Sequence, residues 1–212
     1  MNRETDKWNA AYKNSLNTPP SYDDWLNKHM VILQESKDYP IIDLGCGKGN
    51  NTLYLSEREF SVIACDFSEE ALSLLQKHIP AAETRCFDFS DGLPFPDHYT
   101  PIIIADLSLH YFPWRQTNGI TGEIFRVLKP GGYLFCRLNS VKDTNHGAGC
   151  GELLEENFYR HNGHCKRFFN REQIEELFKA KKIRSKEEYS IDRYTHRKML
   201  WEVIVQNLSV NG

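Results

Sequence analysis

The stretch "IIDLGCGKGN", residues 41–50, joins a short apolar run to a turn with glycines at positions 45, 47 and 49. Glycine adopts positive φ at little cost and lets a ligand approach the backbone without meeting a Cβ atom. An apolar run followed at once by such a turn predicts a buried strand with a binding loop at its carboxyl end.

Strand-like and helical patterns alternate outward from this turn. Apolar, β-rich runs occur at 40–44, 61–65, 83–87, 101–106 and 132–138, and helices are predicted over about 21–36, from Ser68 to Pro80, and from Asn170 to about Lys182. Such alternation is typical of a parallel sheet covered by helices on both faces. Two further strands, near 183–191 and 198–206, follow one another without a helix and predict an antiparallel C-terminal hairpin.

Composition narrows the class of protein. The chain has 212 residues, 26% charged and 40% hydrophobic, with a net charge of −3, which fits one domain with a substantial core. The slight negative charge predicts no nucleic acid partner and no membrane surface partner. Six cysteines without a C-x-x-C pair, and no apolar run long enough to span a bilayer, predict a cytoplasmic protein. The oligomeric state stays open.

Acidic residues end the next two strands. Asp66 can accept hydrogen bonds from a ribose diol, and Asp88 can accept one from an exocyclic amine, with Phe67 and Phe89 beside a flat purine. A dinucleotide motif would need a glycine where Asn50 stands, and no G-K-[ST] closes the turn as in a P-loop. These residues predict an adenosine site without a phosphate site.

Five motifs in order, "IIDLGCGKGN", "ACDFS", "CFDFSDGLPFPD", "IIIADLSLHYF" and "IFRVLKPGGYLF", resemble the class I S-adenosylmethionine-dependent methyltransferases. The resemblance implies an α/β, Rossmann-like, doubly wound sheet of seven strands, mostly parallel with an antiparallel C-terminal hairpin strand. It also implies S-adenosyl-L-methionine as cofactor, held by a set of residues drawn from the first four motifs: Asp43, Gly45, Cys46, Gly47, Asp66, Phe67, Asp88, Phe89, Asp106 and Leu107. A looser similarity links the first motif to the small tellurite-resistance type of methyltransferase.

Two segments flank this predicted core within a single domain, residues 1–212. The N-terminal part, residues 1–37, resembles a lid in which Trp8 and Tyr12 close over the cofactor. Residues 139–169 form a long stretch with little periodicity, and we expect it to be an insert on the substrate side.

The acceptor is predicted to be a small molecule, methylated by in-line displacement. No N-P-P-[YF] motif for exocyclic amines and no Pro-Cys pair for cytosine C5 follow the fourth strand. No residue stands out as catalytic, but His110 and Tyr111 are candidates. Candidate substrate contacts are His110, Tyr111, Arg115, Tyr159, Arg160 and His161. The spacing of His161, His164 and Cys165 is poor for zinc, so no metal site is predicted.

Two alternative functions share parts of this pattern. A nicotinamide-dependent oxidoreductase would also have a glycine turn and an acidic ribose ligand, although the glycine spacing disfavours it. A non-catalytic regulator with the methyltransferase fold would bind the cofactor without turnover.

Overall fold

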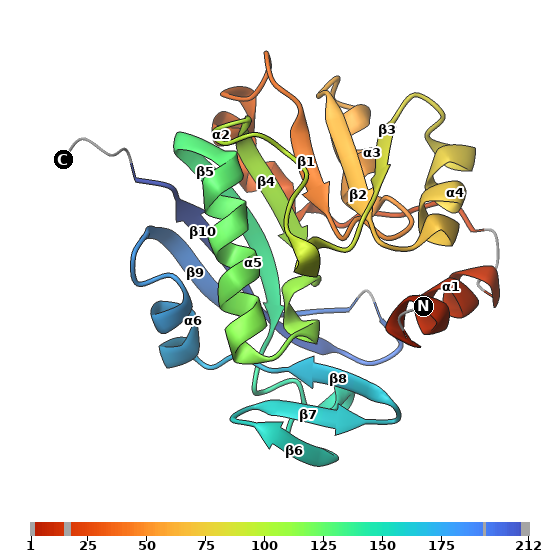
Figure 1. Cartoon of the computed structure of the whole chain (residues 1–212), viewed down its shortest axis with the longest axis vertical. Coiled ribbons are helices and arrows are strands. Elements are labelled where there is room, and N and C mark those ends of the chain that lie inside the picture. Colours follow the sequence, from red (N-terminus) through yellow and green to blue (C-terminus); the bar gives the residue numbers. More distant parts are fainter. Residues whose placement is uncertain (1–2, 15–17, 193, 209–212) are drawn as a thin grey trace.

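A seven-stranded sheet forms the centre of the molecule in the computed structural model, which describes residues 3–14, 18–192 and 194–208. The strand order is β3-β2-β1-β4-β5-β10-β9, and β10 runs antiparallel to both of its neighbours (Figure 1). The strands are β1 (Ile41–Leu44), β2 (Val62–Asp66), β3 (Glu83–Cys86), β4 (Thr100–Asp106), β5 (Leu128–Asn139), β9 (Lys182–Ile191) and β10 (Lys198–Gln206). This topology confirms the predicted Rossmann-like fold with an antiparallel hairpin strand.

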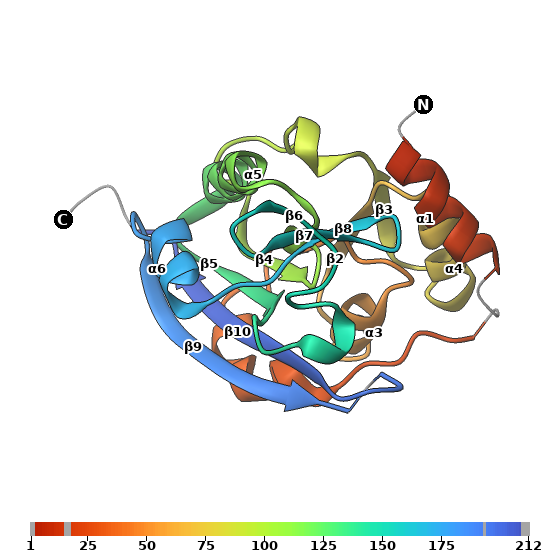
Figure 2. The same ribbon diagram turned by 90° about the horizontal axis from the view of Figure 1, so that it is seen from below.

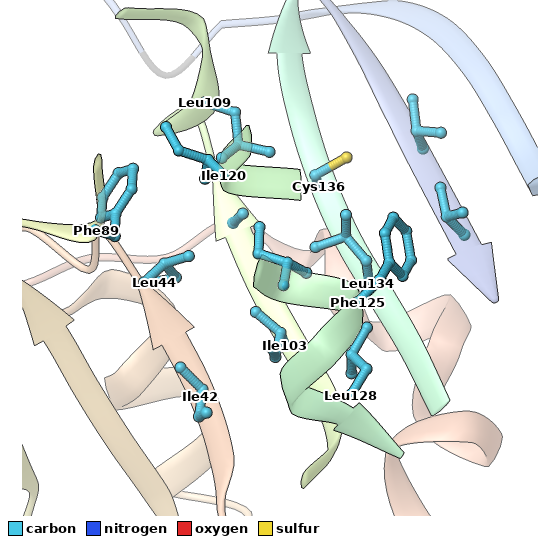
Figure 3. Packing of buried hydrophobic residues seen from close by; sticks show 14 of the residues in the cluster. Ile42, Leu44, Phe89, Ile103, Leu109, Ile120, Phe125, Leu128, Leu134 and Cys136 are labelled. Atoms are coloured by element: carbon cyan, nitrogen blue, oxygen red, sulfur yellow. The ribbon is translucent and has the colours of Figure 1, made fainter. Parts of the chain in front are cut away.

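Successive residues of a strand point to opposite faces of the sheet, and both faces are buried because helices cover them. On one face Ile42, Leu44 and Ile103 pack against α5 (Trp114–Val127), and α6 (Arg171–Leu177) extends this cluster (Figure 3). On the other face Ile41 and Ile104 pack with residues of α2 (Met30–Gln34), α3 (Asn50–Ser56) and the 3-10 helix η1 (Asp24–His29). Leu75 of α4 (Glu69–His78) and Ile79, which follows the helix, cover Ala64 on this second face.

Helix ends follow the predicted caps in two places and differ in two others. Ser68 caps α4 by accepting from Ala71 N, and Asn170 forms a capping box with Gln173, as predicted. The segment predicted as one helix over 21–36 is instead η1 followed by α2. Ser21 does not cap a helix, since η1 begins only at Asp24. The backbone N–H of Ser21 donates to Asn50 Oδ1 at 2.9 Å. Helix α6 ends at Leu177 rather than near 182, since residue 182 already pairs with Gln206 in the sheet.

The long stretch after β5 folds into a structure that the sequence pattern did not reveal. After the 3-10 helix η4 (Thr144–His146) it forms a three-stranded antiparallel sheet of β6 (Glu152–Glu155), β7 (Phe158–His161) and β8 (His164–Arg167). The buried guanidinium of Arg167 donates to the carboxylate of Glu155, which also accepts from the Trp114 backbone N–H at 2.8 Å. This pair attaches the small sheet to the start of α5.

The small sheet and helix α1 (Arg3–Asn14) lie at the same end of the molecule, next to the carboxyl ends of the parallel strands (Figures 1 and 2). In parallel α/β sheets this is the edge where ligands bind. None of the helices within the described ranges combines the length and apolar character that crossing a bilayer requires.

Candidate functional site

The glycine turn after β1 is packed too closely for side chains. Gly45 has φ +74° and Gly47 has φ +54°, a region that favours glycine. A Cβ atom on Gly45 would lie 2.4 Å from Ser108 Cβ, and one on Gly47 would lie 2.8 Å from the Tyr12 hydroxyl oxygen. The turn therefore forms a bare backbone surface between the loop after β4 and helix α1.

Asp66 is fixed at the end of β2 by backbone donors. Its Oδ2 accepts from Gly47 N and its Oδ1 from Ser68 N, both at 2.9 Å. The residue is 5% exposed, and burial raises the pKa of its carboxyl while these backbone bonds oppose the rise. Each carboxylate oxygen keeps a further lone pair that a ligand hydroxyl can use.

Asp43 braces the turn from below and does not line the pocket. Its Oδ2 accepts from Thr52 Oγ1 of α3 at 2.7 Å, and complete burial raises the pKa of its carboxyl to about 7. Although the resemblance assigned Asp43 to the cofactor, the structure places it inside the fold, where it joins β1 to α3.

Asp106 ends β4 in a buried ion pair that sequence reasoning missed. Arg137 Nε and Nη2 donate to its two oxygens at 2.7 Å each, and Arg137 Nη1 donates to Asp23 at 2.6 Å. Arg137 has no exposed surface. The available signal was a charged residue inside the apolar run "GYLFCRLN" of β5, because a buried charge needs a partner. Leu107 follows with φ +54°, and its N–H donates to the Arg137 carbonyl.

These elements enclose a pocket of about 710 Å³, a size typical of small-molecule and cofactor sites. Most of the candidate cofactor residues and two candidate substrate residues line it: Trp8, Tyr12, Gly45, Cys46, Gly47, Asp66, Phe67, Asp88, Phe89, Asp106, Leu107, Tyr111 and Arg160. The structure thus brings together residues from α1 and from the loops after β1, β2, β3 and β4.

Four of the six candidate substrate residues lie outside this pocket. His110 is 3% exposed, and burial lowers the pKa of its imidazole well below the usual value, helped by the charges of Lys198 and Lys166. Arg115 is exposed on α5, outside the pocket, and Tyr159 and His161 line a different cavity. Tyr111 and Arg160 are the two candidates of this group that line the cofactor pocket.

Helix α1 forms one wall of the pocket. Ser68 Oγ donates to Asn9 Oδ1 at 2.6 Å, and Lys13 pairs with Glu70 at 3.1 Å, so α1 is docked on the start of α4. The ring of Trp8 meets Tyr111 edge-on at 5.5 Å between centroids and approaches His164 of β8 at 6.2 Å. Burial and the nearby Asp66 raise the pKa of Tyr12, which keeps its hydroxyl protonated.

The small sheet supplies the opposite wall. Leu154, Phe158, Arg160 and Cys165 line the pocket, and of these only Arg160 was a sequence-based candidate. No sequence signal pointed to the other three, since the strands that carry them are four residues long and lie in a segment without clear periodicity.

Comparison with known proteins shows the family. A model described as a methyltransferase domain matches residues 41–132. The tRNA N(3)-cytidine methyltransferase METTL2 of Gallus gallus is 30% identical over 156 residues, 68% of this chain and 42% of the relative. The putative methyltransferase YqeM of Bacillus subtilis is 30% identical over 135 residues, 62% of this chain and 54% of the relative. The chain thus spans about half the length of these curated relatives, or less.

Solved structures agree on the fold. A SAM-dependent methyltransferase from Methanosarcina mazei superposes with a TM-score of 0.72 at 22% identity, covering 84% of this chain and 97% of its own. An S-adenosylmethionine-dependent methyltransferase from Clostridium acetobutylicum gives 0.67 at 20% identity, covering 96% of this chain and 98% of its own.

The expectation of a small-molecule acceptor and no nucleic acid partner is wrong, because relatives from several animals are named for tRNA. The expectation rested on a net charge summed over the whole chain, which does not describe local groups of positive side chains. The motif arguments excluded exocyclic amines and cytosine C5 but did not address ring nitrogens. The ordered motifs, the strand topology and the family match agree that residues 41–132 belong to a class I S-adenosylmethionine-dependent methyltransferase domain.

Proposed function

We propose that this chain transfers a methyl group from S-adenosylmethionine to the N3 atom of a cytidine in a tRNA. The observation that carries the proposal is the 30% identity, over 156 residues, to a tRNA N(3)-cytidine methyltransferase. The geometry of the pocket supports the proposal in two ways, through its fit to the cofactor and through the groups that it lacks.

The pocket residues fit the cofactor. The bare backbone at Gly45 and Gly47 leaves room that a Cβ atom would fill, as a thioether or sulfonium chain lying against the turn requires. Asp66 would accept from the ribose hydroxyls, and Asp88 and Phe89 would hold the adenine. When bound, the cofactor supplies an activated methyl group on a sulfonium with a good leaving group.

The chemistry at cytidine N3 needs little from the protein. In neutral cytosine N3 carries an in-plane lone pair and no proton, so a general base is not required before attack. Among the described residues no histidine lines the pocket, and its acidic side chains are Asp66, Asp88 and Asp106. Asp106 is paired with Arg137, so Asp66 and Asp88 supply the negative field that accommodates the positive charge as it moves from the sulfonium to the base. Positioning, rather than proton transfer, is therefore the expected source of rate enhancement.

Aromatic side chains at the mouth suit a flat base. Tyr111, Phe112 and Trp8 line the pocket, and a base extruded from RNA can stack on such rings. We propose that the segment within residues 1–37 that contains α1 acts as a lid, and that the 139–169 insert forms the acceptor side of this single domain.

The test is incorporation of methyl groups into tRNA. Unmodified tRNA transcripts are incubated with the protein and S-adenosylmethionine, digested to nucleosides and separated by mass spectrometry. We expect 3-methylcytidine, and at a cofactor concentration near the wild-type dissociation constant we expect much less of it with the Asp66→Ala variant. A transcript whose methylated cytidine is replaced by uridine serves as the substrate control. The proposal would be refuted if only 4-methyl- or 5-methylcytidine appeared. It would also be refuted if no methylated nucleoside were found with cofactor-saturated protein.

A further inference from the structure

A second cavity, of about 330 Å³, lies on the other side of the small sheet. It lies between η4 and strands β7 and β8. Figure 2 shows these strands from below. Its lining is polar and rich in nitrogen-bearing side chains: Thr144, Asn145, His146, Gly147, Cys150, Tyr159, His161, Asn162, His164, Lys166 and Phe168.

The small sheet separates this cavity from the cofactor pocket by a single layer. On β7 and β8 the side chains alternate, as strand geometry requires. Phe158, Arg160 and Cys165 line the cofactor pocket, whereas Tyr159 and Lys166 line the second cavity together with the two histidines of these strands. A chain that reaches the pocket around the edge of this sheet would therefore pass close to both faces.

The second cavity has a positive charge and no acidic side chain in its lining. Within the described part of the chain, the half-buried ammonium of Lys166 makes no hydrogen bond or ion pair. Burial lowers the pKa of Lys166, which shows that its charge is poorly solvated. An anion would relieve this penalty.

The carboxylate that acts electrostatically on Lys166 is Asp143, and it is already paired with Lys198. It is fully buried, and it accepts from Lys198 Nζ at 2.9 Å, from Met199 N at 3.1 Å and from His146 Nδ1 at 2.8 Å. The charges of Asp143 and Lys198 cancel, which leaves the ammonium of Lys166 as the uncompensated charge at the cavity. The field in the cavity therefore favours an anion over a cation.

We propose that this second cavity binds a phosphoryl group, with the Lys166 ammonium as its main cation and Asn145, Asn162 and Tyr159 as neutral donors. A phosphodiester of the RNA backbone near the methylated base is its expected source. This assignment of the source rests on the proposed function, whereas the site itself does not.

The test compares two probes on the full chain. The first is a fluorescein-labelled RNA hairpin with cytidine in its loop, followed by anisotropy over a range of salt concentrations. The second is inorganic phosphate, followed by calorimetry. The variants are Lys166→Ala and Lys166→Gln, and titration with S-adenosylhomocysteine checks that each is folded. Lys142→Ala is the matched control, because this exposed lysine belongs to the same segment but pairs with Glu188 outside the cavity.

We expect both Lys166 variants to bind the hairpin about tenfold more weakly and to lower the salt slope by about 0.7, as for one lost phosphate contact. Lys142→Ala should bind like the wild type. A second outcome is that the wild type binds phosphate but not RNA and that the Lys166 variants lose phosphate binding. This outcome would support the site and assign its phosphoryl group to a free phosphate compound. It would refute the tRNA proposal. If neither probe distinguishes the variants from the wild type, the site is refuted, even where 3-methylcytidine is formed.

Discussion

Removal of the Asp66 carboxylate tests the cofactor site directly. In the ligand-free protein this side chain is 5% exposed and accepts two backbone hydrogen bonds at 2.9 Å, so its oxygens are held in fixed positions at the pocket wall. Charge-assisted hydrogen bonds contribute about 1.5–3 kcal/mol each. Asp66→Ala should therefore weaken binding of S-adenosylhomocysteine by about ten- to a hundredfold if one such bond to the ribose is lost.

The same change also affects the fold, and this effect must be separated from binding. Gly47 N and Ser68 N lose their acceptor, which costs about 1–3 kcal/mol of stability, limited by water that can enter the widened pocket. Thermal unfolding without ligand measures this loss. Asp97→Ala, which removes an exposed carboxylate paired with Arg126 far from the pocket, is the control for a change of one charge.

Calorimetric titration with S-adenosylhomocysteine gives the decisive comparison. Asp66→Ala should bind weakly, and Asp66→Asn should also bind weakly because its amide nitrogen meets a backbone donor. Wild-type affinity in both variants, with intact folding, would show that the end of β2 does not hold the ribose.

Three further changes test the scaffold around the site. Gly45→Ala should lower the melting temperature and abolish cofactor binding, because the new Cβ would lie 2.4 Å from Ser108 Cβ; a normal melting curve would show that the turn can shift. Asp43 holds a proton in the folded state up to about pH 7 that the unfolded chain releases near pH 4, so its contribution makes the free energy of unfolding fall as pH rises through this window. Urea denaturation of the ligand-free protein at several pH values between about 5 and 8 measures this effect. The free energy of unfolding should change less with pH in Asp43→Asn than in the wild type, and the same pH dependence in both proteins would contradict the raised pKa. Arg137→Met leaves Asp106 without its buried partner and should cost about 3–5 kcal/mol in urea denaturation, whereas a loss below about 1 kcal/mol would show that the pair is not important for stability.

The parts of the fold that the sequence predicted are those with a local physical signal. The strand ends at Leu44, Asp66 and Asp106 follow from apolar runs that stop at a turn or a carboxylate, and the cap at Ser68 follows from its position before two glutamates. The order of these elements then places their carboxyl ends at one edge of the sheet, which is how the pocket-lining residues could be chosen.

The parts that the sequence could not predict depend on contacts between distant residues. The four-residue strands of the small sheet are fixed by pairing with each other and by the Arg167–Glu155 bond to α5. His110 and Tyr111 are neighbours in a 3-10 turn, where successive side chains point about 120° apart, so only one of them lines the pocket. The pairing of Arg137 with Asp106 could not be predicted from sequence, because it depends on the register between β4 and β5.

The docking of α1 on α4 has a consequence for the order of events in turnover. Trp8 and Tyr12 wall the pocket while Ser68 Oγ holds Asn9, and the Ser68 backbone N–H is bound by Asp66. If α1 undocks to admit the cofactor and docks again over it, the cofactor binds before the acceptor and its demethylated product leaves after the methylated acceptor. Steady-state kinetics should therefore follow an ordered sequential scheme, with S-adenosylhomocysteine competitive against the methyl donor and noncompetitive against the acceptor.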